Sequence, residues 1–393
     1  MVLNWRFNVE IIIMNIAVVS PGYPTSKTID FVFVDQLCRA FVESGHKVTV
    51  IAPQSLTKSI IRNIPIIKEQ SVIKTVNEST IHLHRPFYLT FGNNKLFKII
   101  NNLNFNRSVR RAFYRITPPP DVCYGHFWES AFAIYPLAKK YSIPLIVSSG
   151  EELISIHKSY SFDELKDFVE YVNGVISVST KNKNEIMNAK LADDDKCKVI
   201  PNAIDPKLFY KKNKNELRKL LNFSTDDFIV AFVGQFTERK GGLRLSKALN
   251  NLNDPSIKAM FIGAGPQVPD YKQIIHQGIV DHSVLPDYLN CADVFVLPTI
   301  NEGCSNSIIE AMACGLPIIS SDMSFNHDIL DDKNSLLIDP RNIGEIAKAI
   351  RMIKTSNAFR IKLSENALLT SSKLSIEKRA DRIIEYIQLQ MNR

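Results

Sequence analysis

The chain has 393 residues, of which 45% are hydrophobic and 22% are charged. This length and composition predict a folded protein of two domains and exclude an intrinsically disordered or collagen-like chain. The formal net charge of +8 favours an anionic partner, and on charge alone a nucleotide, a membrane surface and a nucleic acid all remain open.

An apolar run at residues 11–19 stands near the beginning of the chain. It is shorter than the roughly 20 residues that a helix needs to cross a bilayer, and no small-residue cleavage site follows it. We therefore expect neither a transmembrane helix nor a secretory signal, and we predict the first strand of a domain at residues 16–20. Translation is compatible with a start at Met1 or at Met14.

Strands and helices alternate through the first half of the chain. Apolar runs predict strands, and helical spacing of apolar residues predicts helices. The predicted strands are residues 16–19, 47–52, 122–124, 144–147, 174–179 and 198–200, and the predicted helices are residues 31–44, 128–140 and about 183–189. Continuous apolar strands in this alternation predict a parallel sheet that helices cover on both faces.

A turn-rich stretch at residues 201–206, followed by a Lys- and Asn-rich stretch to Asn215, predicts a domain boundary. We therefore predict a first domain at residues 1–205 and a second domain at residues 206–374. The second domain has predicted strands at residues 228–233, 258–262, 294–297 and 318–319, and the last helix is predicted from Ser375 to about Met391. Open α/β sheets of this kind bind ligands at the carboxyl ends of their strands.

The six cysteines predict no metal site. They are Cys38, Cys123, Cys197, Cys291, Cys304 and Cys314, and no two have C-x-x-C spacing. Most lie in apolar runs, so we expect buried free thiols and a reducing compartment. Cys123 and His126 form the one pair with ligand-like spacing, and no second pair accompanies them.

The most informative stretch is residues 301–310, where Glu302 and Glu310 flank small polar residues. A predicted strand precedes the stretch and a short helix follows its loop. The start of a helix behind a parallel strand binds anions, because free N–H groups point out of the helix end. We expect these groups near Ser305, Asn306 and Ser307.

A second interpretation of the same stretch is purely structural. Ser307 to Glu310 also fits the S-x-x-E pattern of a capping box, in which the glutamate bonds the backbone at the helix start. Taken alone this pattern favours a cap, whereas the presence of Glu302 and the surrounding residues favours ligand binding by Glu310.

The stretch Glu302-x7-Glu310 with Ala311–Ile319 resembles the signature of the retaining GT-B glycosyltransferases of family 4. Further segments resemble that family in the same order, at residues 200–205, 234–241, 261–266 and 285–293. The resemblance covers nearly the whole chain and is stronger after residue 198. It implies an α/β GT-B fold, with two Rossmann-like parallel-sheet domains that face a central cleft and a last helix, residues 375–393, that packs back on the first domain.

The resemblance implies an enzyme of the EC 2.4 class that needs no metal ion and no cofactor besides its donor substrate. Such an enzyme moves a sugar from a nucleotide-diphosphate sugar to a hydroxyl of a glycan or lipid-linked acceptor, and here we expect a role in bacterial surface polysaccharide synthesis. The second domain would hold the donor and the first domain the acceptor. Two alternatives remain open: a nucleotide-sugar epimerase on the same scaffold, and a non-catalytic GT-B partner subunit.

The resemblance also implies roles for single residues. Glu302 would contact the donor sugar near the reacting carbon, and Glu310 would hold the ribose hydroxyls. Lys240 matches the phosphate-binding lysine of the family, and Arg239 stands beside it. His126, at the end of a predicted strand, would reach the donor sugar.

The sequence departs from the family in three loops, and in one of them Ser149, Gly150 and Glu151 stand where relatives often have His-Gly, which would alter acceptor contacts. Gln235 occupies the position after the strand glycine where many members have arginine, so either Arg239 supplies the missing charge or the donor binds more weakly. The first loop, residues 20–26, lacks the Gly-Gly pair that many relatives place near the donor phosphates, and its donor contact stays open.

Residues 79–120 contain no Asp or Glu but carry seven basic residues. They are Arg85, Lys95, Lys98, Arg107, Arg110, Arg111 and Arg115. One interpretation is a helix that packs on the first domain with a solvated basic face. The other is attachment of residues 95–115 to an anionic membrane surface, which would place a cytoplasmic enzyme on the inner face of the membrane. Nucleic-acid binding is not expected, because no binding module of that kind accompanies the charge.

Overall fold

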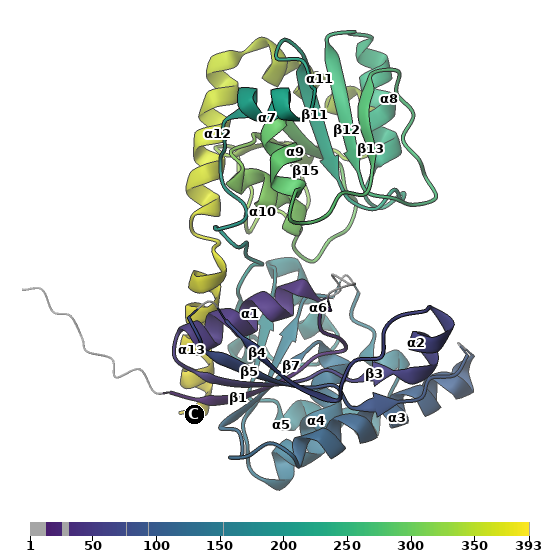
Figure 1. Ribbon diagram of the computed structural model, residues 1–393, viewed down its shortest axis with the longest axis vertical. Coiled ribbons are helices and arrows are strands. Elements are labelled where there is room, and N and C mark those ends of the chain that lie inside the picture. The colour runs from purple at the N-terminus through teal and green to yellow at the C-terminus, as the bar shows by residue number, and fades with distance from the viewer. Residues whose placement is uncertain (1–12, 26–30, 76, 93, 152, 393) are drawn as a thin grey trace, which may run out of the picture. The chain divides into compact units, whose positions relative to one another are not determined.

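The computed structural model describes residues 13–25, 31–75, 77–92, 94–151 and 153–392 (Figure 1). The chain packs as two compact units. The first unit comprises Met1–Ser149, Ser155–Val175 and Ile384–Arg393, and the second comprises Gly150–Ile154 and Ile176–Ile383. The predicted boundary at residue 205 stays a prediction, and the division by packing between the two long segments falls at Val175 and Ile176. Met1 and the beginning of the apolar run, through residue 12, lie outside the described residues.

An eight-stranded sheet has the strand order β10-β9-β8-β7-β1-β2-β5-β4. The strands are β1 (Asn15–Val19), β2 (Lys47–Ile51), β4 (Gln70–Lys74), β5 (Thr80–His84), β7 (Val122–His126), β8 (Leu145–Ser149), β9 (Gly174–Ser177) and β10 (Cys197–Val199). β1 pairs in parallel with β2 and β7, whereas the edge strand β4 is antiparallel to β5. Two short strands, β3 (Gln54–Ser55) and β6 (Phe87–Tyr88), pair separately.

Helices cover both faces of this sheet, as the continuous apolar strands predict. Figure 1 shows α1 on one face and α3 and α4 together on the other. The helices that precede β10 in the chain are α1 (Val32–Glu43), α2 (Leu56–Ile61), α3 (Lys95–Phe113), α4 (Trp128–Lys140), α5 (Phe162–Tyr171) and α6 (Thr180–Asn188), with 3-10 turns at Ile156–Lys158 and Asp194–Lys196. All five residues of β1 are buried, so side chains on both of its faces leave water.

The second unit contains a six-stranded parallel sheet of order β13-β12-β11-β14-β15-β16. Its strands are β11 (Phe228–Val233), β12 (Ile257–Ile262), β13 (Ile274–Gly278), β14 (Val294–Leu297), β15 (Ile318–Ser321) and β16 (Ser335–Ile338). The helices that follow β10 are α7 (Lys214–Leu220), α8 (Gly242–Leu252), α9 (Leu285–Cys291), α10 (Asn306–Ala313), α11 (Ile343–Thr355), α12 (Asn357–Ser371) and α13 (Ile376–Met391). Phe232, Phe261 and Phe295 fill the core of this unit.

Each sheet reverses its strand order beside its first strand. β1 lies between β2 and β7, and β11 lies between β12 and β14. The connections on the two sides of such a strand leave toward opposite faces, so a crevice opens outside the carboxyl ends of the central strands. This geometry predicts that ligands bind to the loops after β1 and β7 in the first unit, and to the loops after β11 and β14 in the second.

The predicted α/β architecture with two parallel-sheet domains is confirmed. The antiparallel edge strand β4 was not predicted, because its residues alternate between half-buried and exposed and form no apolar run. The six cysteines are buried and carry no disulfide, as expected. Within the described residues, no helix is both long and apolar enough to cross a membrane.

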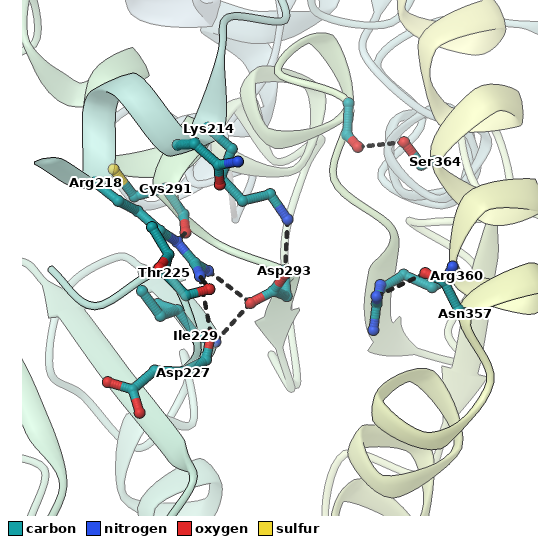
Figure 2. A network of polar contacts seen from close by, with 12 residues as sticks. Lys214, Arg218, Thr225, Asp227, Ile229, Cys291, Asp293, Asn357, Arg360 and Ser364 are labelled. Carbon is teal, nitrogen blue, oxygen red and sulfur yellow. Dashed lines mark hydrogen bonds and ion pairs between the residues drawn. The ribbon is translucent and has the colours of Figure 1, made fainter.

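A buried ion pair joins α7 to the sheet of the second unit (Figure 2). Arg218, 2% exposed, donates to the Asp293 carboxylate at 2.7 Å and to the carbonyls of Cys291 and Asp227, both at 2.9 Å. Asp293 also accepts from the Ile229 N–H at 2.8 Å and from Lys214 Nζ at 2.7 Å. Every hydrogen bond of the guanidinium therefore ends on a fixed acceptor, which offsets the cost of burying its charge.

We predict that Asp293→Asn lowers the free energy of unfolding by about 3 kcal/mol at pH 7, because it leaves Arg218 buried without a counter-charge. Burial by itself raises the pKa of Asp293, but Lys214, the Ile229 N–H and Arg218 outweigh it and hold the pKa below its usual range. A carboxyl with a lowered folded-state pKa contributes stability above its unfolded pKa of about 3.9 and loses it as the pH falls.

The difference in the free energy of unfolding between wild type and Asp293→Asn should therefore become smaller below about pH 5. Urea unfolding followed by circular dichroism measures this difference. Asp287→Asn is the matched control, since its partner Lys212 is a quarter exposed and the pair should contribute less than about 1 kcal/mol. A difference that stays constant from pH 7 to pH 4 would contradict the assignment.

Candidate functional site

The crevice of the second unit holds a cluster of one acid and two cations. Lys240 Nζ lies 2.5 Å and Arg239 Nη1 lies 3.1 Å from the same carboxylate oxygen of Glu302. That oxygen also accepts a hydrogen bond from the Thr299 hydroxyl at 3.0 Å. Glu302 is 7% exposed, so its charge is neutralised inside the protein rather than by water.

Two loops that are far apart in sequence build this cluster. Lys240 and Arg239 follow β11, whereas Glu302 follows β14, and the Ile300 N–H donates to the Arg239 carbonyl at 2.9 Å. Gly241 permits the approach, because it has a left-handed φ of 80° and a Cβ there would lie 2.4 Å from the Pro298 carbonyl oxygen. The sheet topology thus brings three of the predicted site residues together.

A buried arginine that the sequence did not single out fixes the same loops. Arg244 on α8 donates to the carbonyls of Pro298 and Glu238, both at 2.8 Å, and of Pro340 at 2.9 Å. Burial lowers its pKa despite the nearby Glu238 carboxylate. An arginine on the buried side of an amphipathic helix was the available signal, but nothing in one sequence names the carbonyls it binds.

Helix α10 begins at the other side of the loop. It starts at Asn306 with Ser305 as N-cap, and no side chain caps its first N–H groups. Asn202 donates to the Cys304 carbonyl at 3.1 Å and to Asn306 Oδ1 at 2.9 Å, and the Ser305 and Ser307 hydroxyls lie 3.1 Å apart. The loop is therefore held by the protein while its helix end offers N–H groups to an anion.

The capping-box interpretation of Ser307 and Glu310 is wrong. The helix has already begun at Ser307, and Glu310 instead lies 3.2 Å from His282 Nε2. Glu310 is 9% exposed, and the His282 ring packs against Phe209 with centroids 5.1 Å apart. Hydrogen bonding to Glu310 raises the pKa of His282 against the effect of burial. Sequence reasoning missed His282, because no motif accompanies it.

Two further predicted residues lie elsewhere. Gln235 is exposed just after β11, with its side chain in solvent. His126 is the last residue of β7 in the first unit, is 6% exposed, and packs between Phe33 and Phe127 with ring centroids 5.1 Å and 4.5 Å away. The roles predicted for these two residues stay predictions. In the part of the chain that the structure describes, no group of three His, Cys, Asp or Glu residues could hold a metal ion.

The architecture and the crevice define a class of protein. Two Rossmann-like α/β units, each with a crevice at the strand-order reversal, form the GT-B fold, and one crevice presents cations and a helix N-terminus. Sucrose-phosphate synthase from Thermosynechococcus elongatus has the same fold, with a TM-score of 0.76 and 21% identity over 97% of this chain and 100% of that one.

Comparison with known families and proteins agrees with the fold. The model of Glycosyl transferases group 1 matches residues 213–370, and the model of Glycosyltransferase Family 4 matches residues 31–208. TuaC of Bacillus subtilis, a candidate teichuronic acid biosynthesis glycosyltransferase, is 28% identical over 348 residues, or 86% of this chain and 88% of that protein.

A second relative is an Escherichia coli UDP-Gal:α-D-GlcNAc-diphosphoundecaprenol α-1,3-galactosyltransferase. It is 27% identical over 239 residues, which cover 56% of this chain and 61% of that protein. Together with the two family models, these similarities show that the chain belongs to the GT-B glycosyltransferases.

We predict that Glu310→Gln lowers the pKa of His282 toward its ordinary value of about 6.5, because the anionic partner is lost. A raised folded-state pKa means that the contact contributes stability fully below about pH 6.5 and loses it as the pH rises through the folded-state pKa. Histidine titration by NMR in wild type and Glu310→Gln measures both values.

His276 is the internal control, since burial lowers its pKa and Glu310 is not among the groups that shift it. Its titration should be the same in both proteins. An unchanged titration of His282 would show that Glu310 does not set its charge.

Proposed function

We propose that this chain is a retaining glycosyltransferase that moves a sugar from a nucleotide-diphosphate sugar to a hydroxyl of a glycan or lipid-linked acceptor. The observation that carries the proposal is the meeting of Lys240, Arg239 and Glu302 in one crevice beside the start of α10. Cations and free N–H groups there suit a diphosphate, and the acid suits a sugar.

The cations would stabilise the leaving group. Lys240 and Arg239 retain 14% and 24% of their side-chain exposure, so a diphosphate can reach both from solvent. As the bond from the anomeric carbon to phosphate breaks, negative charge grows on the phosphate oxygen, and the two cations and the N–H groups of α10 oppose it. Because the chain itself supplies this charge, we propose that transfer needs no metal ion.

In the transfer step, the bonds that form and break and the proton that moves all belong to the donor and the acceptor. The acceptor oxygen bonds to the anomeric carbon on the face from which the phosphate leaves, so the configuration at that carbon is retained. The leaving phosphate oxygen takes the proton of the acceptor hydroxyl. Glu302, with its charge shared by Lys240, would bind the donor sugar and oppose the positive charge that develops at the anomeric carbon.

Glu310 would hold the ribose hydroxyls of the nucleotide. Its carboxylate is almost buried, is oriented by His282, and keeps acceptor capacity for hydroxyl groups. The UDP-Gal donor in the name of the Escherichia coli relative supports a nucleotide-sugar donor here. The teichuronic acid role in the name of TuaC supports a place in bacterial surface polysaccharide synthesis.

We further propose that the first unit attaches a cytoplasmic enzyme to an anionic membrane surface through α3. Leu96, Ile99 and Leu103 share one helical face and are 64%, 48% and 49% exposed. The exposed Lys95 and Arg107 flank them, and no acid occurs in residues 79–120. An apolar helix face beside basic residues matches an anionic bilayer.

The structure changes which basic residues can serve this attachment. Arg85 is buried and donates to the Tyr23 and Pro24 carbonyls at 3.1 and 2.8 Å. Arg110 donates to the Ala133 carbonyl at 3.0 Å, and Arg115 lies 2.9 Å from Glu69. These arginines hold the first unit together, so the membrane proposal rests on the part of α3 from Lys95 to Arg107.

We predict that the protein converts at least one donor in a panel of UDP-, GDP- and ADP-sugars, by transfer or by slow hydrolysis, and that chelation with EDTA leaves the rate unchanged. Lys240→Ala and Glu302→Ala should each lower kcat by about a hundredfold or more, because each removes charge that acts at the transition state. NMR of the released or transferred sugar should show the donor anomeric configuration.

Glu365→Gln, an exposed change in α12, is the control and should leave the rate unchanged. Conversion of the donor sugar without release of nucleotide would indicate an epimerase. Absence of any turnover, with Glu302→Ala indistinguishable from wild type in nucleotide binding, would reject the enzymatic proposal.

We predict that the protein floats with phosphatidylglycerol vesicles and not with phosphatidylcholine vesicles. Lys95→Glu with Arg107→Glu should weaken binding about thirtyfold or more, since each basic residue near an anionic surface contributes about 1 kcal/mol. Lys140→Glu with Lys166→Glu, on exposed positions of α4 and α5, is the matched control. Equal flotation of the two double variants would exclude α3 as the attachment site.

A further inference from the structure

A pocket opens at the strand-order reversal of the first unit. Its volume is about 350 Å³, and its lining includes Pro21, which follows β1, and Glu129, which follows β7. These are the two neighbouring strands whose connections leave in opposite directions. The pocket therefore lies where an open α/β sheet binds its ligand, independently of the crevice in the second unit.

One part of the pocket wall is aromatic and suits a sugar ring. Tyr88 and Phe105 meet edge to face, with ring centroids 5.7 Å apart and an interplanar angle of 76°. The amide of Asn102 also lines the pocket and makes no hydrogen bond with the residues that the structure describes. Apolar faces with a few polar groups that fix orientation are typical of small-ligand sites.

Glu129 contributes the one acid of the pocket lining. No ion pair joins its carboxyl to any described residue, and burial raises its pKa although a hydrogen bond from its own backbone N–H acts in the opposite direction. A half-buried carboxyl without a cation partner is costly unless it has hydrogen-bond donors. The hydroxyl groups of a sugar would supply such donors.

Two lysines contribute positive charge to the same lining. Lys58 on α2 and Lys98 on α3 are exposed, and neither forms an ion pair with a described residue. Arg115 is instead paired with Glu69, and Arg110 donates to the Ala133 carbonyl. Lys58 and Lys98 are thus available to an anion in the pocket.

We propose that this pocket binds the acceptor and selects an acceptor whose sugar carries an anionic group, a phosphate or a carboxylate. Lys58 and Lys98 pair with the anionic group, Tyr88 and Phe105 pack against the sugar ring, and Glu129 accepts hydrogen bonds from its hydroxyls. This inference rests on the proposed glycosyltransferase function and specifies its acceptor class.

Calorimetry on the full chain tests the proposal with the crevice of the second unit saturated by the nucleoside diphosphate of the active donor. The probes are octyl α-N-acetylglucosaminyl diphosphate, octyl glucuronide and neutral octyl glucoside. At least one anionic probe should bind about tenfold or more tightly than the neutral one, and the Lys58→Gln, Lys98→Gln double variant should abolish that preference. Glu129→Gln should weaken binding of all three probes to a similar extent.

Lys166→Gln, on an exposed position of α5, is the control and should keep the preference. Preference for the diphosphate probe would assign a phosphorylated acceptor, and preference for the glucuronide would assign an acidic sugar. Equal binding of anionic and neutral probes, or a preference that survives the double variant, would overturn the proposal. Nucleotide binding in the same samples separates this outcome from failure of the proposed function, in which no nucleotide binds at all.

Discussion

The contact between Glu302 and the two cations Lys240 and Arg239 is the interaction on which the rest of the site depends. It joins the loop after β11 to the loop after β14, and these loops meet only because the two strands are neighbours in the sheet. The contact pairs one carboxylate with two cations, so it neutralises the charge of Glu302 and leaves a positive charge for an anionic ligand. It also keeps the cations near the start of α10, where a donor phosphate would find both charge and N–H groups.

The second unit contains a second ionic cluster, around Arg218 and Asp293, which stabilises the fold rather than offering a binding site. Arg218 and Asp293 are buried, and their bonds end on backbone groups and on Lys214, so the cluster is complete without a ligand (Figure 2). Glu302, Lys240 and Arg239 keep part of their exposure. A ligand can therefore reach Lys240 and Arg239, whereas Arg218 has a side-chain exposure of 2% and serves a structural role.

The proposed ligand sites of the two units lie at the same kind of position in their sheets, although the proposed ligands differ. Each sheet reverses its strand order beside its first strand, and each reversal has polar groups at the carboxyl edge. In the second unit these groups suit a nucleotide diphosphate. In the first unit Glu129, two lysines and two aromatic rings suit a sugar with an anionic group.

The sequence by itself determined the fold class and most of the candidate site. Strand and helix periods are local properties, and the motif around Glu302 and Glu310 is contiguous, so both can be read without knowing what packs against them. The tertiary structure decided which residues from separate elements contact one another. His282 beside Glu310, Glu69 beside Arg115, the carbonyls that bind Arg85 and Arg244, and the pocket around Glu129 all join residues from separate elements. Their roles depend on burial and on which loops the sheet order brings together, and no single stretch of sequence encodes either.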